Sequence, residues 1–239
     1  MTRIFVKSDL KKNEGLALSV PQSHYLTHVM RFTEGDKVVC FNGKQGDWEA
    51  VLFKQKKEWL LIPQKQILSQ QERAKCILCL ALIKRDPLVL ALQKATELGV
   101  TEIHLVQAER SNNERVNMDR LCATIIEASE QCERNDIPAL FAPEPLPKII
   151  EKLSGKNQLV WLSERGTTTG KMSKLPPAFF IGPEGGWTEK EKNLFQKSNA
   201  FSWHLGNTIL RAETAAVTAL ALWQYRDEIK KLAIKFFYR

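Results

Sequence analysis

The first 65 residues alternate short apolar segments with turn-forming residues, a pattern typical of a small β-rich domain. Four segments have the length and composition of strands: Arg3–Val6, Lys37–Phe41, Trp48–Phe53 and Trp59–Ile62. The dipeptide Asn42-Gly43 follows the second segment and predicts a hairpin turn. A short helix is expected over 23–32. We therefore predict a small β-barrel or sandwich of the OB or PUA type, followed by a polar linker over 63–74.

From residue 75 onward the pattern changes to apolar runs separated by helical periods. Residues 76–83, CILCLALI, form a continuous apolar run, which is typical of a strand covered on both faces. A helix is expected over 86–98, ending at Gly99, and a capping box of Thr188 and Glu191 predicts the start of another. Further strands are expected at 101–106, 159–162, 178–181 and 202–205, and further helices at 117–132, 144–153 and 213–231. Strands that alternate with helices predict an α/β domain with a largely parallel sheet, and we place the two domains at 1–70 and 71–239.

Composition narrows the class of protein. The chain has 239 residues, of which 44% are hydrophobic and 26% charged, and this excludes collagen-like, low-complexity and mostly disordered classes. No run approaches the ~20 apolar residues of a membrane helix. The first 15 residues lack the apolar block of a signal peptide, so export is not expected. Five scattered cysteines fit a reducing cytoplasm better than a disulfide framework.

The charge is unevenly distributed. The net charge is +8, and residues 1–70 contribute +4 while residues 226–239 contribute +3. A basic chain favours a polyanionic partner, although ordinary solubility explains such an excess equally well.

The first motif with possible chemistry is Gly182-Pro183-Glu184-Gly185-Gly186, which lies between an expected strand and a capped helix. Glycines permit positive φ angles and a close approach of backbone to ligand. Parallel α/β sheets bind ligands beyond the carboxyl ends of their strands. The motif is neither a phosphate-binding P-loop nor a dinucleotide fingerprint, and a simple tight turn is the alternative.

The second motif runs from Leu205 to Ala215, LGNTILRAETA, and also joins a strand to a helix. Arg211 lies at this junction, where a guanidinium group suits phosphate or carboxylate recognition. Glu213 has two interpretations, because it can act in catalysis or simply complement the helix dipole.

Metal binding is not expected. Cys76 and Cys79 have no second pair or nearby histidine, and they lie in the buried strand pattern. His24 and His28 are spaced i, i+4 on the short helix, but a third ligand is not apparent. His204, near the end of the last strand, remains ambiguous.

These motifs resemble the RsmE family, bacterial 16S rRNA uridine-N3 methyltransferases of the SPOUT superfamily. Residues 180–187, FIGPEGGW, with Glu191, and residues 205–215 have the family's pattern in the family's order. Residues 24–31 match its H-x-L-x-x-V-L-R segment with Met30 in place of leucine. Further matches are KATELGV at 94–100, Arg110-Ser111, and the segment from Glu127 to Pro138. The resemblance spans nearly the whole chain.

The resemblance implies a PUA-like N-terminal domain and a C-terminal methyltransferase domain with a deep trefoil knot. It also implies a homodimer, the cofactor S-adenosylmethionine (SAM), and a target in the small ribosomal subunit, the uridine called 1498 in 16S rRNA. No membrane and no metal are implied.

In this superfamily three loops at strand ends form the cofactor pocket. In this chain the resemblance places them at Leu162-Ser163-Glu164, at Gly182 to Gly186, and at Leu205 to Leu210, so the expected cofactor-binding residues are Leu162, Ser163, Gly182, Pro183, Glu184, Gly185, Gly186, Leu205, Gly206, Asn207, Ile209 and Leu210. The expected RNA contacts are Arg3, Lys11, Lys12, His24, Arg31, Arg110 and Arg134.

For catalysis, Arg211 is the expected cation and Glu213 the expected base, with His204 as a rival base. Three other functions stay open at this point: a SPOUT methyltransferase for tRNA or 23S rRNA, a non-catalytic RNA-binding assembly factor, and a nucleotide-binding α/β enzyme of another kind.

Overall fold

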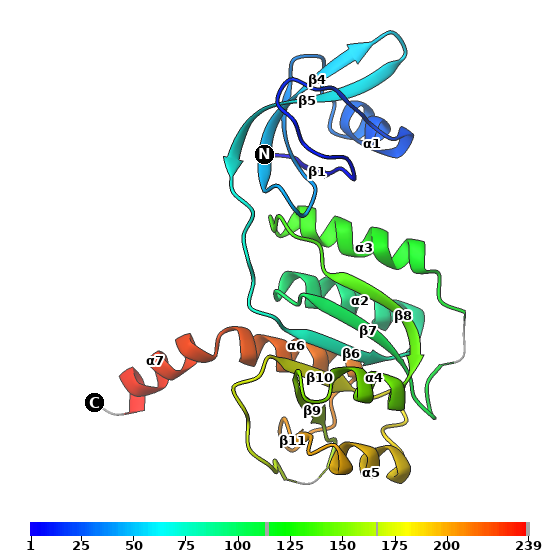
Figure 1. The fold of residues 1–239 in the computed structure, drawn as a ribbon, viewed down its shortest axis with the longest axis vertical. Helices are drawn as coiled ribbons and strands as arrows, with labels where there is room; N and C mark the ends of the chain where they lie inside the picture. The colour runs from blue at the N-terminus through cyan, green and yellow to red at the C-terminus, as the bar shows by residue number, and fades with distance from the viewer. Residues whose placement is uncertain (113–114, 166, 238–239) are drawn as a thin grey trace. The chain divides into compact units, whose positions relative to one another are not determined.

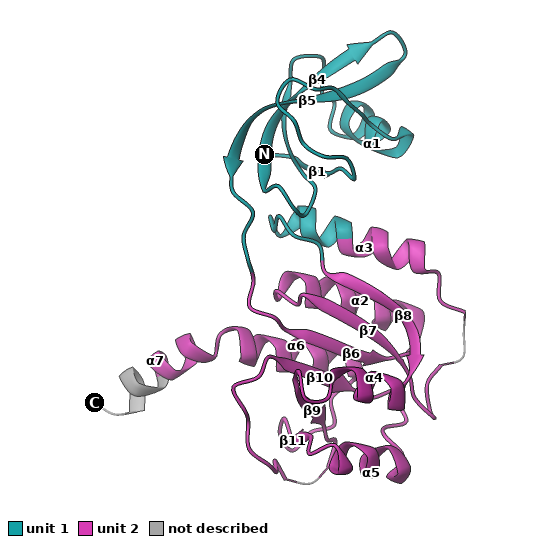
Figure 2. Cartoon of the chain, viewed as in Figure 1, with its two compact units in different colours: residues 1–72, 126–137 teal, residues 73–125, 138–239 magenta. Residues whose placement is uncertain are grey.

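The computed structural model describes residues 1–112, 115–165 and 167–237, with side chains as far as Leu232. The chain forms two compact units, shown in Figures 1 and 2. The first consists of Met1–Glu72 and Ile126–Ile137, and the second of Arg73–Ile125 and Pro138–Arg239. The segment 126–137 thus belongs to the first unit although it lies between two strands of the second in the sequence.

The first unit contains a five-stranded sheet among its described residues, in the order β1-β3-β4-β5-β2. Its strands are β1 (Arg3–Phe5), β2 (Leu16–Ala17), β3 (Lys37–Phe41), β4 (Asp47–Gln55) and β5 (Glu58–Leu68). β1 pairs with β3 in parallel, whereas the other pairs are antiparallel. Leu26, Val38, Leu52 and Leu61 are fully buried in its core.

Two sequence expectations for this unit need correction. The linker expected over 63–74 begins later, because β5 continues through Pro63 to Leu68. Pro63 fits because it pairs with Ala50 beside a register shift, and such irregularities tolerate a residue without an N–H. The helix expected over 23–32 begins earlier, since Ser19 caps α1 (Val20–His24) in a capping box with Gln22. A π-helix, Tyr25–Val29, continues it.

The end of α3 (Met118–Gln131) and the residues after it complete the first unit. Glu130 accepts a hydrogen bond from the Phe5 backbone N–H at 2.8 Å, on the edge strand β1. Asn135 donates to the Ser69 carbonyl at 3.0 Å. These contacts satisfy backbone groups that would otherwise lack a partner at the sheet edge.

The second unit is an α/β domain with a parallel sheet, as the alternating pattern predicts. Within the described residues the sheet has six strands in the order β11-β9-β10-β6-β7-β8, all paired in parallel. The strands are β6 (Ile77–Ala81), β7 (Glu102–Gln107), β8 (Ala139–Pro145), β9 (Gln158–Leu162), β10 (Pro177–Ile181) and β11 (Phe201–Trp203). The helices are α2 (Arg85–Glu97), α3, α4 (Leu146–Leu153), α5 (Glu189–Lys197), α6 (Ala212–Gln224) and α7 (Arg226–Phe237).

Helices cover both faces of this sheet. Phe179 and Phe180 are neighbours in β10 and therefore point to opposite faces. Phe180 packs edge-on against Phe195 of α5 with 5.2 Å between ring centroids, while Phe179 packs against Trp223 of α6 at 6.2 Å. Every residue of β6, β9 and β10 is buried, as expected of strands covered on both sides.

Some elements of this unit differ from the sequence expectations. The strand β8 is not among the predicted strands, because its half-exposed sequence ALFAPEP lacks a continuous apolar run. The helix expected at 144–153 begins at Leu146, and the helix expected at 213–231 is divided at Tyr225 into α6 and α7. Among the described helices, none is long and apolar enough to cross a membrane.

Candidate functional site

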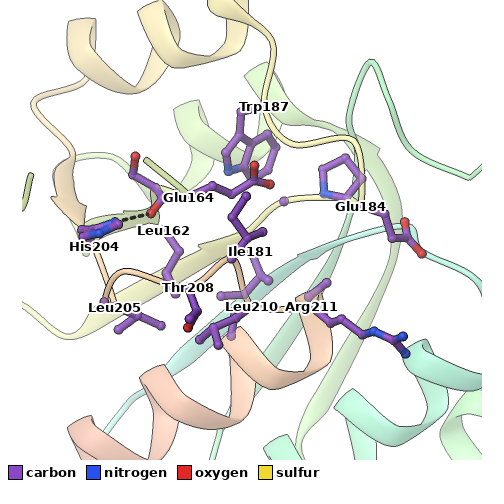
Figure 3. A pocket seen from close by; sticks show the side chains of 17 residues that line it. Leu162, Glu164, Ile181, Glu184, Trp187, His204, Leu205, Thr208, Leu210 and Arg211 are labelled. Carbon is purple, nitrogen blue, oxygen red and sulfur yellow. Dashed lines mark hydrogen bonds between the residues drawn. The ribbon is translucent and has the colours of Figure 1, made fainter. Parts of the chain in front are cut away.

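Three loops at the carboxyl ends of neighbouring strands enclose a cavity of about 190 Å³ in the second unit. They follow β9, β10 and β11, which lie side by side in the sheet. The cavity lies beside the point where the strand order changes direction. The chain adds β7 and β8 on one side of β6, and then adds β9, β10 and β11 on the other side. Such a switch point is where open α/β sheets bind ligands. Figure 3 shows the side chains that line the cavity.

The cavity walls are mostly apolar. Leu162, Ile181 and Leu210 line it together with Leu205 and Ile209. A small number of polar groups accompany them, among them Ser163, Glu164, Thr208 and Arg211. Apolar walls with a few polar groups suit a small organic ligand.

The glycine turn after β10 brings the backbone close to neighbouring side chains. A Cβ atom on Gly182 would lie 3.1 Å from Nε1 of Trp187, a buried residue that lines the cavity. Gly186 has a φ of +67°, in the left-handed region, and its Cβ would lie 2.9 Å from a carboxylate oxygen of Glu164. Its N–H donates to the Pro183 carbonyl at 2.8 Å and closes the turn. The turn therefore depends on glycine at both positions.

The predicted capping box at the start of α5 is confirmed. Thr188 and Glu191 form reciprocal hydrogen bonds, and Glu191 is buried. Glu191 also accepts a hydrogen bond from the Glu109 backbone N–H at 2.9 Å, in the loop after β7. Arg110 in that loop donates to the Gly185 carbonyl at 2.6 Å. These contacts hold the glycine turn against its neighbouring loop.

The loop after β11 leads directly into α6. Arg211 is the residue before the helix, with extended backbone and an exposed side chain that caps no helix amide. Figure 3 shows the Arg211 side chain extending away from His204 and Leu205. Glu213 lies in the first turn of α6, half-buried, and is not among the residues that line the cavity.

His204 lines the cavity, and its hydrogen bond fixes its tautomer. Its Nδ1 lies 3.1 Å from the Ser163 carbonyl oxygen, which can only accept. Nδ1 therefore carries a hydrogen, and in the neutral tautomer that this bond selects the lone pair is on Nε2. The arrangement leaves Nε2 able to accept a proton.

The structure brings most of the expected cofactor-binding residues together. The cavity is lined by Leu162, Ser163, Gly182, Pro183, Glu184, Leu205, Gly206, Ile209 and Leu210 from that set. Gly185 and Gly186 line a smaller neighbouring cavity, and Asn207 lines neither. Four further residues line this cavity from outside the three expected loops: Ile181, Trp187, Ala212 and Ala215. Their positions next to the two motifs were the available signal.

Two of the expected RNA contacts are engaged inside the first unit. Arg3 donates to both carboxylate oxygens of Asp47 at 2.8 Å, and the two side chains are 8% and 4% exposed. The Arg134 side chain is 1% exposed and donates to both carboxylate oxygens of Asp136. Both guanidinium groups are buried and paired with carboxylates, so the proposed RNA contacts do not include them.

The other expected RNA contacts are exposed. Lys11, Lys12, His24 and Arg31 lie on the surface of the first unit. The His24 ring stacks on the His28 ring with 4.7 Å between centroids. Arg110 is exposed in the second unit. Lys11 forms an exposed ion pair with Glu14 at 3.3 Å and Arg110 donates to the Gly185 carbonyl, but all five side chains remain accessible to an external anion.

The described residues contain no group of three or more potential ligands that could hold a metal ion. Cys76 and Cys79 are buried, and burial raises the pKa of the Cys76 thiol to about 12. The pKa of Cys79 is also raised well above its usual value by burial. Both remain neutral thiols that pack in the strand.

Comparison with known proteins agrees with this geometry. The family described as RNA methyltransferase domain matches residues 70–224, and the RNA methyltransferase PUA domain matches residues 18–63. The chain is 31% identical to ribosomal RNA small subunit methyltransferase E of Rickettsia conorii, over 92% of this chain and 93% of the relative. The chain belongs to this methyltransferase family. It is also 26% identical to the Bacillus subtilis protein of the same name, over 96% and 98%.

Solved structures of relatives support the family assignment. A Legionella pneumophila protein, whose structure holds the bound cofactor SAM, is 28% identical with a TM-score of 0.85 over 94% of this chain and 97% of that one. Ribosomal RNA small subunit methyltransferase E of Neisseria gonorrhoeae, bound to S-adenosyl methionine, is 26% identical with a TM-score of 0.81, over 95% and 98%. The expected family, the parallel-sheet methyltransferase domain and the PUA-like domain are thereby confirmed.

Proposed function

We propose that this protein transfers a methyl group from SAM to N3 of a uridine in 16S rRNA of the small ribosomal subunit, the uridine called 1498. One observation carries the proposal: the chain shares a family with the named rRNA methyltransferases over nearly its whole length, and a ligand cavity lies within the matched methyltransferase domain.

The residues of the cavity fit this cofactor. Leu162, Leu205 and Leu210 offer apolar walls for an adenine ring. A side chain at Gly182 would press on Trp187, which lines the cavity, so glycine at this position preserves the cavity wall. The buried Trp187 Nε1 has no hydrogen-bond partner among the described residues, which is a further sign of a site made to receive a polar molecule.

When bound, SAM supplies an electrophilic methyl group on a sulfonium. The protein must then act on the acceptor, because uracil N3 carries a proton and is a poor nucleophile. Arg211, exposed at the cavity, stabilises the negative charge that develops on the uracil when this proton leaves. The cavity loops hold the two reactants in orientation, which contributes a large part of the rate.

Two side chains can accept the N3 proton, and they differ in placement. His204 lines the cavity with a free lone pair on Nε2. Glu213 lies in the first turn of α6 and reaches substrate only from outside the cavity. His204→Gln and Glu213→Gln variants separate them: the variant of the true base loses the acidic limb of the pH–rate profile, whereas the other retains it.

The expected exposed cations complete the RNA-binding residues in this proposal: Lys11, Lys12, His24, Arg31 and Arg110. The target base leaves its surroundings to reach the cavity, as base-modifying enzymes require.

The proposal also includes the knot and the dimer. Support for the knot comes from the strand order: β10 follows β9 along the chain and pairs with it on one side, and the chain then returns to place β11 on the other side of β9. Support for a homodimer comes from apolar side chains exposed on α6 and α7: Leu222, Ile229 and Leu232. Analytical ultracentrifugation tests the dimer, since a monomer at micromolar concentration would contradict it. The reaction takes place in the cytoplasm, where ribosomal subunits are assembled.

Mass spectrometry of 16S rRNA from a strain that lacks this protein tests the reaction. The methylated uridine should disappear and return when the gene is restored. Persistence of the modification refutes the assignment. Calorimetric titration with SAM tests the cofactor separately, and a protein without affinity for SAM would be a non-catalytic RNA-binding factor instead.

A further inference from the structure

A second cavity, of about 330 Å³, lies in the methyltransferase unit beyond the ends of β6 and β7. Leu82 and Ile83, which follow β6, form part of its apolar lining together with Leu88 of α2 and Leu121 of α3. The Asn112 N–H donates to the Leu82 carbonyl at 2.8 Å and fastens the loop after β7 to the end of β6. The apolar floor of the cavity is therefore formed by the segments that leave β6 and β7 and by the helices that follow them.

Three arginines line this cavity: Arg85, Arg115 and Arg120. All three are exposed, and within the described part of the chain no carboxylate lines the cavity beside them. Asp86 and Asp119 are neighbours in sequence but are not among the lining residues. Three positive charges around a concave surface attract anions to it. Guanidinium groups are especially suited to binding phosphate oxygens.

The position of the cavity links it to the methyl-transfer site. Both cavities lie at the carboxyl edge of the same parallel sheet, on strands β6 and β10 that pair directly. Lys84, between Ile83 and Arg85, donates its backbone N–H to the Glu184 carboxylate at 3.4 Å. Glu184 lines the cofactor cavity. Lys84 thus connects the two sites, because its neighbours Ile83 and Arg85 line the second cavity and its N–H contacts Glu184 of the glycine turn.

We propose that this cavity binds the phosphodiester backbone of RNA beside the target nucleotide, with Arg85, Arg115 and Arg120 on the phosphate and the apolar floor against the ribose. The proposal rests on the proposed function, because it needs an RNA strand that enters the adjacent site. A flanking nucleotide held in this cavity restricts the movement of the target base. Phosphate contacts of this kind fix the position of the RNA strand on the protein without recognising its sequence.

The test uses small ribosomal subunits from a strain that lacks this protein. Their binding to the wild-type protein is compared with binding to Arg85→Ala, Arg120→Ala and the double variant, across a range of KCl concentrations. Each alanine variant should bind roughly tenfold more weakly, as expected when a charge-assisted hydrogen bond is removed. The slope of log affinity against log salt should fall by about 0.7–0.9 for each phosphate that the variant no longer neutralises. Lysine at the same positions should restore the slope.

Controls separate RNA binding from folding. SAM affinity, measured by calorimetry, should be unchanged in every variant. Lys156→Ala removes an exposed cation before β9, at the opposite edge of the same sheet, and should leave binding and slope unchanged. A parallel loss of SAM affinity would show that the arginines stabilise the fold, and would overturn the proposal.

Three further outcomes are decisive. A double variant with wild-type affinity and slope overturns the proposal. Saturable binding of inorganic phosphate or ATP that the double variant loses, with subunit affinity unchanged, assigns the cavity to a small phosphate ligand and also overturns it. If the wild-type protein binds subunits without methylating them, the proposed function is refuted. The phosphate-binding proposal is then judged separately, by whether the arginine substitutions weaken binding to the subunits.

Discussion

Adding one methyl group at Gly182 tests how tightly the glycine turn after β10 is packed. In Gly182→Ala the new Cβ lies 3.1 Å from Nε1 and 3.2 Å from Cε2 of Trp187. Trp187 cannot easily yield, because it is buried and its ring packs edge-on against Phe195 with 5.1 Å between centroids. Overpacking of this kind costs about 1–3 kcal/mol of stability.

Gly185→Ala, in the same turn, is a matched control. Its Cβ would lie 3.2 Å from Cδ and 3.3 Å from Cβ of Arg110, an exposed loop residue that can shift more readily than a buried ring, although its hydrogen bond to the Gly185 carbonyl must adjust. Neither Gly182 nor Gly185 has a positive φ, so alanine strains the backbone at neither position. Each substitution also raises the free energy of unfolding by about 0.4–1 kcal/mol, because alanine reduces the conformational freedom of the unfolded chain. This effect cancels when the two variants are compared. Gly182→Ala should therefore be about 1–3 kcal/mol less stable than Gly185→Ala.

Urea unfolding followed by tryptophan fluorescence measures the difference, and calorimetric titration measures SAM affinity. We expect Gly182→Ala to bind SAM more weakly, because Trp187 lines the cavity and must shift. Adding Trp187→Phe should make room for the methyl group and recover part of the loss, with a coupling of about 0.5–3 kcal/mol. Equal stability and equal affinity of the two alanine variants would refute the close contact, as would the absence of coupling.

The remaining predictions concern three other side chains. Arg3→Ala should destabilise the protein by about 3–5 kcal/mol in urea unfolding, since it leaves the buried Asp47 carboxylate unpaired, and an unchanged midpoint would contradict a structural role. Arg31→Ala should lower RNA affinity and its salt slope without affecting SAM binding, and its unfolding midpoint should not change because arginine and alanine meet the same strain in the left-handed backbone at φ 59°. For His104, burial lowers the pKa below 6.5, although Glu102 partly offsets this. The unfolded chain therefore binds more protons as pH falls below about 6.5, and the free energy of unfolding should decrease there. His104→Phe should weaken this dependence, and an identical pH profile would contradict it.

The sequence predicts the second unit well where strands are covered on both faces. Residues 76–83 and 178–181 are continuous apolar runs, and a run of that kind has few alternatives in a soluble α/β protein. β8 was missed because its residues are only half-buried, so it lacks both the continuous run and strict alternation. Such a segment becomes a strand because it pairs with β7, and this pairing cannot be seen in the sequence of the segment itself.

The first unit shows a different limit. Pro63 marked the start of a linker in the sequence, yet the strand continues because a bulge opposite removes the need for its N–H. Similarly, Arg3 and Arg134 have the composition of a basic surface, but Asp47 and Asp136 pair with them in the fold. The charge pattern of the sequence does not show which arginines form an ion pair in the folded protein. The expected RNA contacts therefore include two arginines whose guanidinium groups bind carboxylates instead.

The candidate site follows the same logic. Motif positions identified the loops, because the carboxyl ends of parallel strands are where ligands bind. The side chains that reach in from elsewhere were missed: Trp187 comes from the start of the next segment and Ala215 from the beginning of α6.

The arginine-lined cavity shows most clearly how a parallel sheet assembles residues that are distant in sequence. The rest of α2, β7 and the loop after β7 separate Arg85 from Arg120 in the sequence, and no local pattern relates the two residues. The pairing of Ala81 with Val106 aligns the ends of β6 and β7, so the segments that leave these strands must begin at the same edge of the sheet. Because β10 pairs with β6 on the other side, the same alignment places the glycine turn there as well. A strand register that packing alone requires thus brings the proposed RNA backbone site next to the proposed methyl-transfer site, and a charge substitution at either arginine tests that adjacency without changing a residue of the proposed cofactor cavity.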